Sequence, residues 1–156
     1  MALGAGWDAC GMHDGDAFGW NAAEAERAFD RALRARRRSS LLLRLRRACV
    51  ACARLAIHEL RSSARIGASG AVREIPLDAI TGSVEPNRAT LFDREFRPSL
   101  SVRSRWLSVW HAEQRGAGLP PISVVAVDDG YAVRDGHHRV SVARSRGALS
   151  IAAAIA

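Results

Sequence analysis

The spacing of apolar and polar residues divides the chain into a helical amino-terminal part and a carboxy-terminal part with strands. Residues 22–61 contain no proline or glycine, and their leucines, alanines and cysteines recur at steps of three and four. This period predicts an amphipathic helix, or a pair of helices broken near Ser39 and Ser40. Asn21 is a suitable capping residue at the start of the pattern. Residues 1–20 are glycine-rich and aperiodic, so we expect them to be loose.

The carboxy-terminal part alternates short apolar runs with helical patterns. Strand-like runs occupy residues 72–82, 119–127, 131–135 and 149–155, and helical spacing covers residues 99–115 and 136–146. Asp-Asp-Gly at 128–130 predicts a hairpin turn between the second and third runs. Trp106 and Trp110 fall on one side of the first helical pattern, which indicates core packing. This order predicts an α+β domain over residues 72–156, with a small mixed β-sheet and packed helices.

The predicted organisation therefore has three parts: a loose segment at 1–20, a basic amphipathic helix or helix pair at 21–65, and the α+β domain at 72–156. All 23 basic residues are arginine, and they exceed the 16 acidic residues to give a net charge of +7. That balance favours association with nucleic acid, nucleotides or acidic surfaces.

The arginine-rich residues 31–47 leave several interpretations open. They are consistent with a solvated helix face that packs on the domain or on a second copy of the chain, giving a homodimer. They are also consistent with a nucleic-acid surface, for which Arg44, Arg47 and Arg54 are the candidate contacts. A membrane-surface helix has little support, because the segment lacks the Trp and Phe anchors that such helices use, so we expect no membrane partner.

The sequence shows no secretory signal and no apolar run of about 20 residues that would span a bilayer. We therefore expect a cytoplasmic protein. Cys49 and Cys52 form a C-x-x-C inside the helical pattern, where a thiolate is not stabilised, and no second ligand pair accompanies them. We interpret them as small apolar helix residues and expect no metal site.

The chemistry-bearing stretch is Asp135 to Arg139, DGHHR, where a strand-like run passes directly into a helical one. Backbone N–H groups in the first turn of a helix have no intrahelical partner, and with the helix dipole they attract anions. Gly136 would let a ligand approach the backbone, and Asp135 would cap the helix. Arg139 offers a guanidinium and His137 and His138 offer imidazoles to a phosphate. Adjacent histidines point about 100° apart on a helix, which disfavours a zinc site.

The segments IPLDAI, FDREFRP and LPPISVVAV…YAVRDGHHRVSVAR, with a closing I-x-A strand, resemble the ParB/sulfiredoxin-like superfamily. In detail they are similar to small ParB-like nuclease domains common in actinobacteria, and the resemblance covers about half of the chain, from Arg73 onward. Gly136 and Arg139 match the phosphate-binding boxes of both ParB proteins and sulfiredoxin. His138 matches the sulfiredoxin histidine, whereas His137 stands where ParB has glutamate and sulfiredoxin has cysteine.

The resemblance implies a nucleotide-phosphate site at Asp135, Gly136, His137, His138 and Arg139, with a nucleoside triphosphate and Mg²⁺ as the implied cofactor. Without a thiol at His137, sulfinic-acid reduction is not expected. The candidates for a catalytic role are His137 and His138, but the sequence does not decide whether a reaction is catalysed. Two alternatives remain open: a DNA-binding module without nucleotide chemistry, and a small phosphotransferase or nuclease.

Overall fold

A mixed sheet forms the centre of the fold in the computed structural model, which describes residues 14–46, 53–59 and 71–156. Its strands are β1 (Ala56–Ile57), β2 (Val72–Pro76), β3 (Ile80–Ser83), β4 (Ile122–Val127), β5 (Gly130–Asp135) and β6 (Ser150–Ile155). They form one six-stranded sheet in the order β1-β3-β5-β4-β6-β2. The β4–β5 and β2–β6 pairs are antiparallel, and β1–β3, β3–β5 and β4–β6 are parallel. The predicted α+β class with a small mixed sheet is therefore confirmed.

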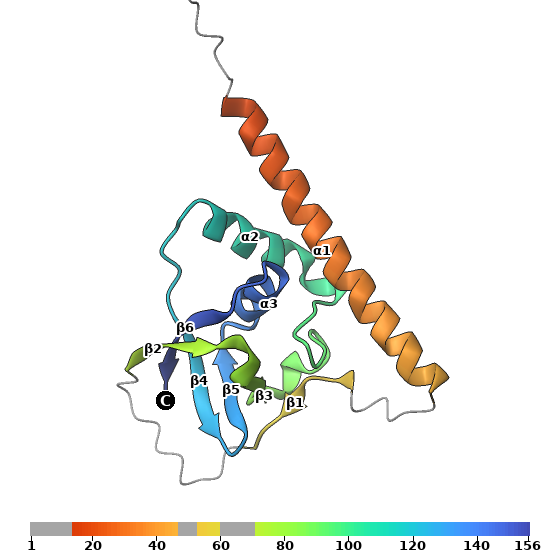
Figure 1. Cartoon of the computed structure of the whole chain (residues 1–156), viewed down its shortest axis with the longest axis vertical. Coiled ribbons are helices and arrows are strands. Elements are labelled where there is room, and N and C mark those ends of the chain that lie inside the picture. Colours follow the sequence, from red (N-terminus) through yellow and green to blue (C-terminus); the bar gives the residue numbers. More distant parts are fainter. Residues whose placement is uncertain (1–13, 47–52, 60–70) are drawn as a thin grey trace, which may run out of the picture.

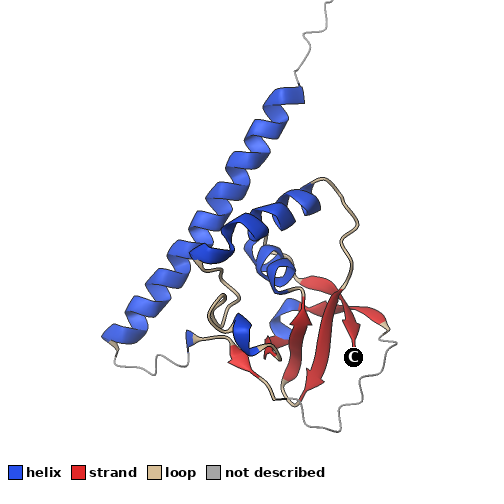
Figure 2. Ribbon diagram, turned by 180° about the vertical axis from the view of Figure 1, so that it is seen from behind, coloured by secondary structure: helices blue, strands red, loops and turns tan. Residues whose placement is uncertain are grey.

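The described residues form three α-helices beside this sheet: α1 (Asp14–Leu45), α2 (Arg103–Gln114) and α3 (His137–Ser145). Short 3-10 turns η2 (Leu77–Ala79), η3 (Pro86–Arg88) and η4 (Leu100–Val102) lie in the connections. The helices α2 and α3 lie between the sheet and α1, and both ends of α1 extend past them (Figure 1). Figure 2 shows the same layers from behind.

Aromatic side chains attach α1 to the rest of the fold. Ala25, Ala28, Phe29 and Ala32, spaced at steps of three, one and three, form the buried stripe of α1. The Phe29 ring meets the Trp106 ring edge-on at 5.4 Å, and Trp106 donates a hydrogen bond of 2.9 Å to the Ser141 hydroxyl on α3. The prediction that the tryptophans are core residues is confirmed, because they join all three helices in one apolar cluster.

The amino-terminal helix differs from its prediction in two ways. It begins at Asp14, so residues 14–20 are helical; the single helix, one of the two predicted alternatives, is found, because α1 runs unbroken through Ser39 and Ser40 to Leu45. The prediction of helix over residues 53–59 is wrong, because this segment is extended and β1 pairs with Gly82 and Ser83 of β3. The apolar period continued there, but pairing to a sheet edge satisfied the backbone instead.

The region that the sequence predicted as one strand and a turn contains two strands. The segment VREIPLDAITG forms β2, the turn η2 and β3. Strands β2 and β3 lie at opposite sides of the sheet, and β3 runs parallel to β5. This placement brings the carboxyl ends of β3 and β5 to the same edge, beside the start of α3. No helix among the described residues is long and apolar enough to cross a bilayer.

Candidate functional site

The start of α3 follows β5 without a loop, as the sequence predicted. Gly136 occupies the N-cap position with φ of 104°, in the left-handed region, and no side chain caps the helix. The backbone N–H groups of His137, His138 and Arg139 therefore have no intrahelical acceptor, and they lie at the positive end of the helix dipole. This is the local chemistry of an anion site.

The structure gives a different reason for glycine at 136 from the predicted approach of a ligand. A Cβ atom there would lie 2.5 Å from Ile122 Cγ2, which is far inside van der Waals contact. The positive φ also disfavours any other residue. Gly136 is thus required by the close packing of the α3 start against β4.

Asp135 and Arg139 form an ion pair with each other. The sequence had predicted that Asp135 caps the helix and that the Arg139 guanidinium is available to a phosphate. The Arg139 Nη2 atom lies 2.9 Å from the Asp135 carboxylate, and Arg139 also donates a hydrogen bond to the Pro120 carbonyl. The Arg139 side chain is largely buried in this position, whereas the Asp135 side chain is 76% exposed. The predicted capping role of Asp135 is therefore not found, and Arg139 would have to leave these acceptors to bind a phosphate.

His137 is buried and connects the start of α3 to the end of β3. Its Nε2 atom lies 2.7 Å from the Ser83 hydroxyl oxygen, which also accepts a hydrogen bond from the Glu85 N–H at 2.9 Å. The His137 ring stacks on the Phe92 ring, with the ring centres 6.1 Å apart and the planes inclined by 24°. Burial, together with the positive charge of Arg88, lowers the pKa of His137 to about 4. His137 is therefore neutral at pH 7.

His138 lies beside His137 but makes different contacts. Its ring meets the Phe92 ring edge-on at 5.3 Å, and its Nε2 atom is buried without a hydrogen-bond partner. Burial, followed by the charges of Arg88 and Arg105, lowers the pKa of His138 to about 4. A buried nitrogen without a partner is unfavourable, so this position has unused hydrogen-bonding capacity.

Arg88 and Arg105 are the residues of this site that the sequence analysis missed. Arg88 ends η3 and Arg105 lies in the first turn of α2, and their charges act on the histidines at the start of α3. The ion pairs among the described residues involve neither guanidinium. No motif surrounds either arginine, and only the chain fold brings them to DGHHR.

Of the arginines predicted to contact nucleic acid, the two described ones, Arg44 and Arg54, do not lie on one helix. Arg44 lies in the last turn of α1, whereas Arg54 lies in the extended segment and forms an isolated bridge with Asp93. Arg47 lies outside the described residues. Arg44 and Arg54 are separated because α1 ends at Leu45, before Arg54.

Carboxylates and histidines do not cluster as metal ligands: no three His, Cys, Asp or Glu side chains of residues 14–46, 53–59 and 71–156 gather in one place. Asp135 is the acidic residue next to the start of α3. Magnesium bound with a nucleotide commonly uses one or two carboxylates plus the phosphates. The exposed carboxylate of Asp135 could supply one such ligand. Cys10, Cys49 and Cys52 lie outside the described residues.

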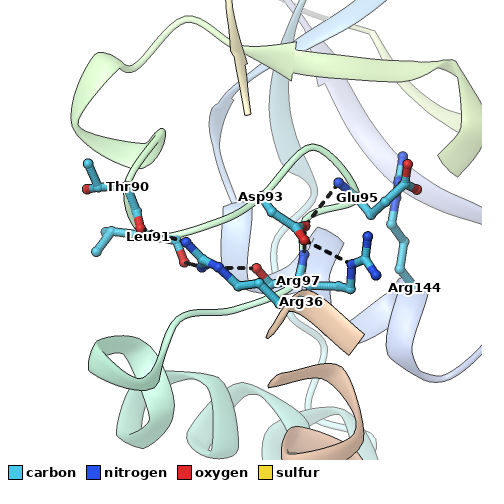
Figure 3. Close-up of polar contacts among 7 residues, drawn as sticks. All are labelled: Arg36, Thr90, Leu91, Asp93, Glu95, Arg97 and Arg144. Atoms are coloured by element: carbon cyan, nitrogen blue, oxygen red, sulfur yellow. Dashed lines mark hydrogen bonds and ion pairs between the residues drawn. The ribbon is translucent and has the colours of Figure 1, made fainter. Parts of the chain in front are cut away.

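A cleft of about 760 Å³ opens elsewhere, beside β1 and β3, and residues of the α3 start do not line it. One of its three arginines, Arg144, already donates hydrogen bonds of 2.8 and 3.1 Å to the carbonyls of Leu77 and Ile80. Figure 3 shows Arg144 next to Glu95 at the edge of this region. We therefore place the candidate site at the start of α3, where donors are without partners, and not in the roomier cleft.

Comparison with known proteins assigns the chain to no family. Neither a protein-family model nor a curated protein matches the chain. Among solved structures, sulfiredoxin from Arabidopsis thaliana is similar, with 22% identity and a TM-score of 0.41 over 55% of this chain and 84% of that chain. At this identity the similarity says nothing of ligand or reaction.

Proposed function

We propose that the chain binds a phosphate-bearing ligand, such as a nucleotide, at the start of α3. The observation that supports this most strongly is that the charges of Arg88 and Arg105 act on His138, which lies in the uncapped first turn of α3. Two guanidiniums and up to three backbone N–H groups match the acceptor oxygens of a phosphate chain.

The histidines have separate parts in this proposal. His137 is a positioning residue, because its hydrogen bond to Ser83 holds the end of β3, from which the Arg88 turn continues, against α3. His138 is the neutral group with unused hydrogen-bonding capacity, and it would donate to a phosphate oxygen after a small rotation of its ring. Magnesium, when bound with a nucleoside triphosphate, would neutralise part of the phosphate charge, with Asp135 as the available carboxylate.

Isothermal titration with CTP, ATP and GTP, each with and without Mg²⁺, tests the proposal. We expect at least one nucleotide to bind, and Arg88→Ala or Arg105→Ala to weaken its binding by about tenfold, as loss of a charge-assisted hydrogen bond implies. Arg115→Ala is the matched control, because Arg115 is exposed at the far end of α2. The proposal fails if no nucleotide binds, or if Arg88→Ala and Arg115→Ala behave alike.

A catalytic function at the same site, as a phosphotransferase or a nuclease, depends on the proposed phosphate binding. A neutral imidazole beside a phosphate can accept a proton from an attacking hydroxyl or water. His138 is better suited than His137, whose Nε2 is engaged with Ser83. A turnover that falls in His138→Ala by far more than the nucleotide affinity does would support it.

A second candidate function, DNA association, draws on the solvent side of α1. Arg31, Arg34 and Arg38 are exposed and lie at steps of three and four, so they follow one line along the helix. Such a line can follow a phosphate backbone. Retention of duplex DNA that falls steeply with salt, and less steeply in Arg34→Gln/Arg38→Gln, would support this function; no retention at low salt would exclude it.

A further inference from the structure

Exposed leucines gather at the carboxyl end of α1. Leu41 is 57% exposed, Leu45 is 80% exposed and Leu100 on η4 is 60% exposed. Leu41 and Leu100 line the same groove of about 490 Å³, together with Leu33. The α1 wall of this groove extends from Leu33 to Arg44, which corresponds to about 16 Å of helix. An apolar groove of this length is suited to a few turns of another helix.

The groove is a fixed feature because α1 is tied to the loop beside it. The Arg36 guanidinium donates hydrogen bonds to the carbonyls of Leu91 at 2.8 Å and Thr90 at 3.0 Å, and also contacts the Arg97 carbonyl (Figure 3). These contacts hold the middle of α1 against the segment that precedes η4. The groove therefore needs no rearrangement before it can receive a partner.

Charge restricts what can occupy the groove. Its polar lining consists of Arg36, Arg37, Arg44, Ser40 and Ser99, without a carboxylate. The same grooves of two copies would repel each other, because each carries several arginines. A nucleic-acid backbone would satisfy the arginines but would leave the leucines exposed, since phosphates and sugars offer little apolar surface. The suitable occupant is an acidic helix with small or apolar residues.

The chain itself contains such a helix in the first half of α1. Residues 14–30 contain the acids Asp14, Asp16, Glu24, Glu26 and Asp30 and the single base Arg27, whereas residues 31–45 contain Arg31, Arg34, Arg36, Arg37, Arg38 and Arg44 and no acid. Glu24 and Asp30 are exposed, as are Asn21 and Ala23; within the chain Glu24 accepts a hydrogen bond from Gln114 and Glu26 pairs with Arg103 at the two ends of α2. Two α1 helices placed antiparallel would bring each acidic half against the basic half of the other.

We infer that two copies of the chain associate through antiparallel α1 helices, with the acidic half of each α1 in the leucine and arginine groove of the other. A two-fold axis relates such helices, so both grooves are filled and the assembly closes at two copies. The inference is independent of the phosphate site, because it uses neither α3 nor Arg88.

Analytical ultracentrifugation of the full chain over a wide concentration range tests the association. We expect a dimer whose dissociation constant rises with salt, and rises about tenfold or more in Leu41→Asp or Arg44→Glu. Leu149→Asp is the matched control, because Leu149 is 88% exposed but lies before β6, away from α1. A monomer at every concentration, or a dimer indifferent to Leu41→Asp, would overturn the inference.

Disulfide trapping tests the orientation. In a background with Cys10, Cys49 and Cys52 replaced by serine, Ala23→Cys chains mixed with Ser40→Cys chains should form more disulfide-linked dimer than either variant alone. Preferential linkage of Ser40→Cys to itself would overturn the antiparallel arrangement. Monomeric protein that uses Leu41 and Arg44 to bind anionic lipid vesicles or duplex DNA would also overturn the inference and assign the groove to that partner.

Discussion

Ser83 and His137 are 54 positions apart in the chain, yet the Ser83 hydroxyl oxygen and His137 Nε2 lie 2.7 Å apart in a buried hydrogen bond. The bond joins the carboxyl end of β3 to the first turn of α3, and thereby sets the position of the turn that carries Arg88. The Ser83 hydroxyl also bonds to the Glu85 N–H and the Val133 carbonyl, so its removal leaves more buried groups without a partner than removal of the His137 ring does.

Ser83→Ala should therefore destabilise the fold and loosen the candidate site. The substitution removes the hydroxyl that bonds to His137 Nε2 and that accepts the Glu85 N–H. Leaving such buried groups without a partner reduces the free energy of unfolding by about 1–3 kcal/mol. Urea denaturation measures this, with the exposed Ser108→Ala as the control. An unchanged free energy of unfolding would show that the bond contributes nothing.

The stability of the protein should fall as the pH decreases from about 6.5 towards 4. The fold lowers the pKa of both His137 and His138 from 6.5 to about 4. Between pH 6.5 and pH 4 the unfolded chain therefore binds more protons than the folded one, and acid favours unfolding. The loss in free energy of unfolding is on the order of 2 kcal/mol per histidine, since one pKa unit corresponds to about 1.4 kcal/mol. Urea denaturation at pH 7, 6 and 5 measures it. His137→Gln should flatten the profile; an equally steep profile in that variant would contradict the assignment.

Arg88→Met should raise the pKa of both histidines. The Arg88 charge disfavours the imidazolium form of each, whereas methionine retains most of the apolar stem without the charge. Titration of the histidine ring signals by nuclear magnetic resonance measures the two values separately. Arg115→Met should leave both unchanged. If the pKa values of His137 and His138 were unchanged in Arg88→Met, the Arg88 guanidinium would not lie near the histidines.

Gly136→Ala should destabilise the protein more than Gly147→Ala does. Both glycines have positive φ, 104° and 72°, but only at Gly136 would the new Cβ meet Ile122 at 2.5 Å, whereas open space surrounds Gly147. The positive φ alone costs about 1 kcal/mol, and the contact with Ile122 adds overpacking of about 1–3 kcal/mol. Thermal denaturation compares the two variants. Equal losses would show that β4 accommodates the added methyl group.

Phe29→Ala should detach α1 from α2. The Phe29 ring is fully buried against Trp106, and truncation of a buried phenylalanine costs about 3–5 kcal/mol. Limited proteolysis should then cut α1 faster in the variant than in the unsubstituted protein. Circular dichroism measures the accompanying loss of helix. Leu45→Ala, at an exposed position of the same helix, is the control and should change neither. A protease-resistant Phe29→Ala helix would mean that other contacts of α1 hold it.

Several elements could be predicted from the local sequence, because the residues that define each of them lie within a few positions of one another. The Asp-Asp-Gly turn defined the β4–β5 hairpin, and the change from alternation to helical spacing at Gly136 located the start of α3. The spacing of Trp106 and Trp110 identified a core face. The α+β class followed from the order of these elements. The sequence analysis failed at residues 53–59, where an apolar period compatible with a helix became the edge strand β1.

By itself, then, the sequence determined the chemistry at the strand-to-helix junction of DGHHR and the separation of charge along α1, since both depend on neighbouring residues. The tertiary structure alone decided which groups surround that junction. It brought Ser83, Arg88 and Arg105 to the histidines and turned Arg139 towards Pro120 and Asp135. These placements depend on sheet order and on the packing of α2, and such long-range contacts leave no periodic or spacing signal in the chain.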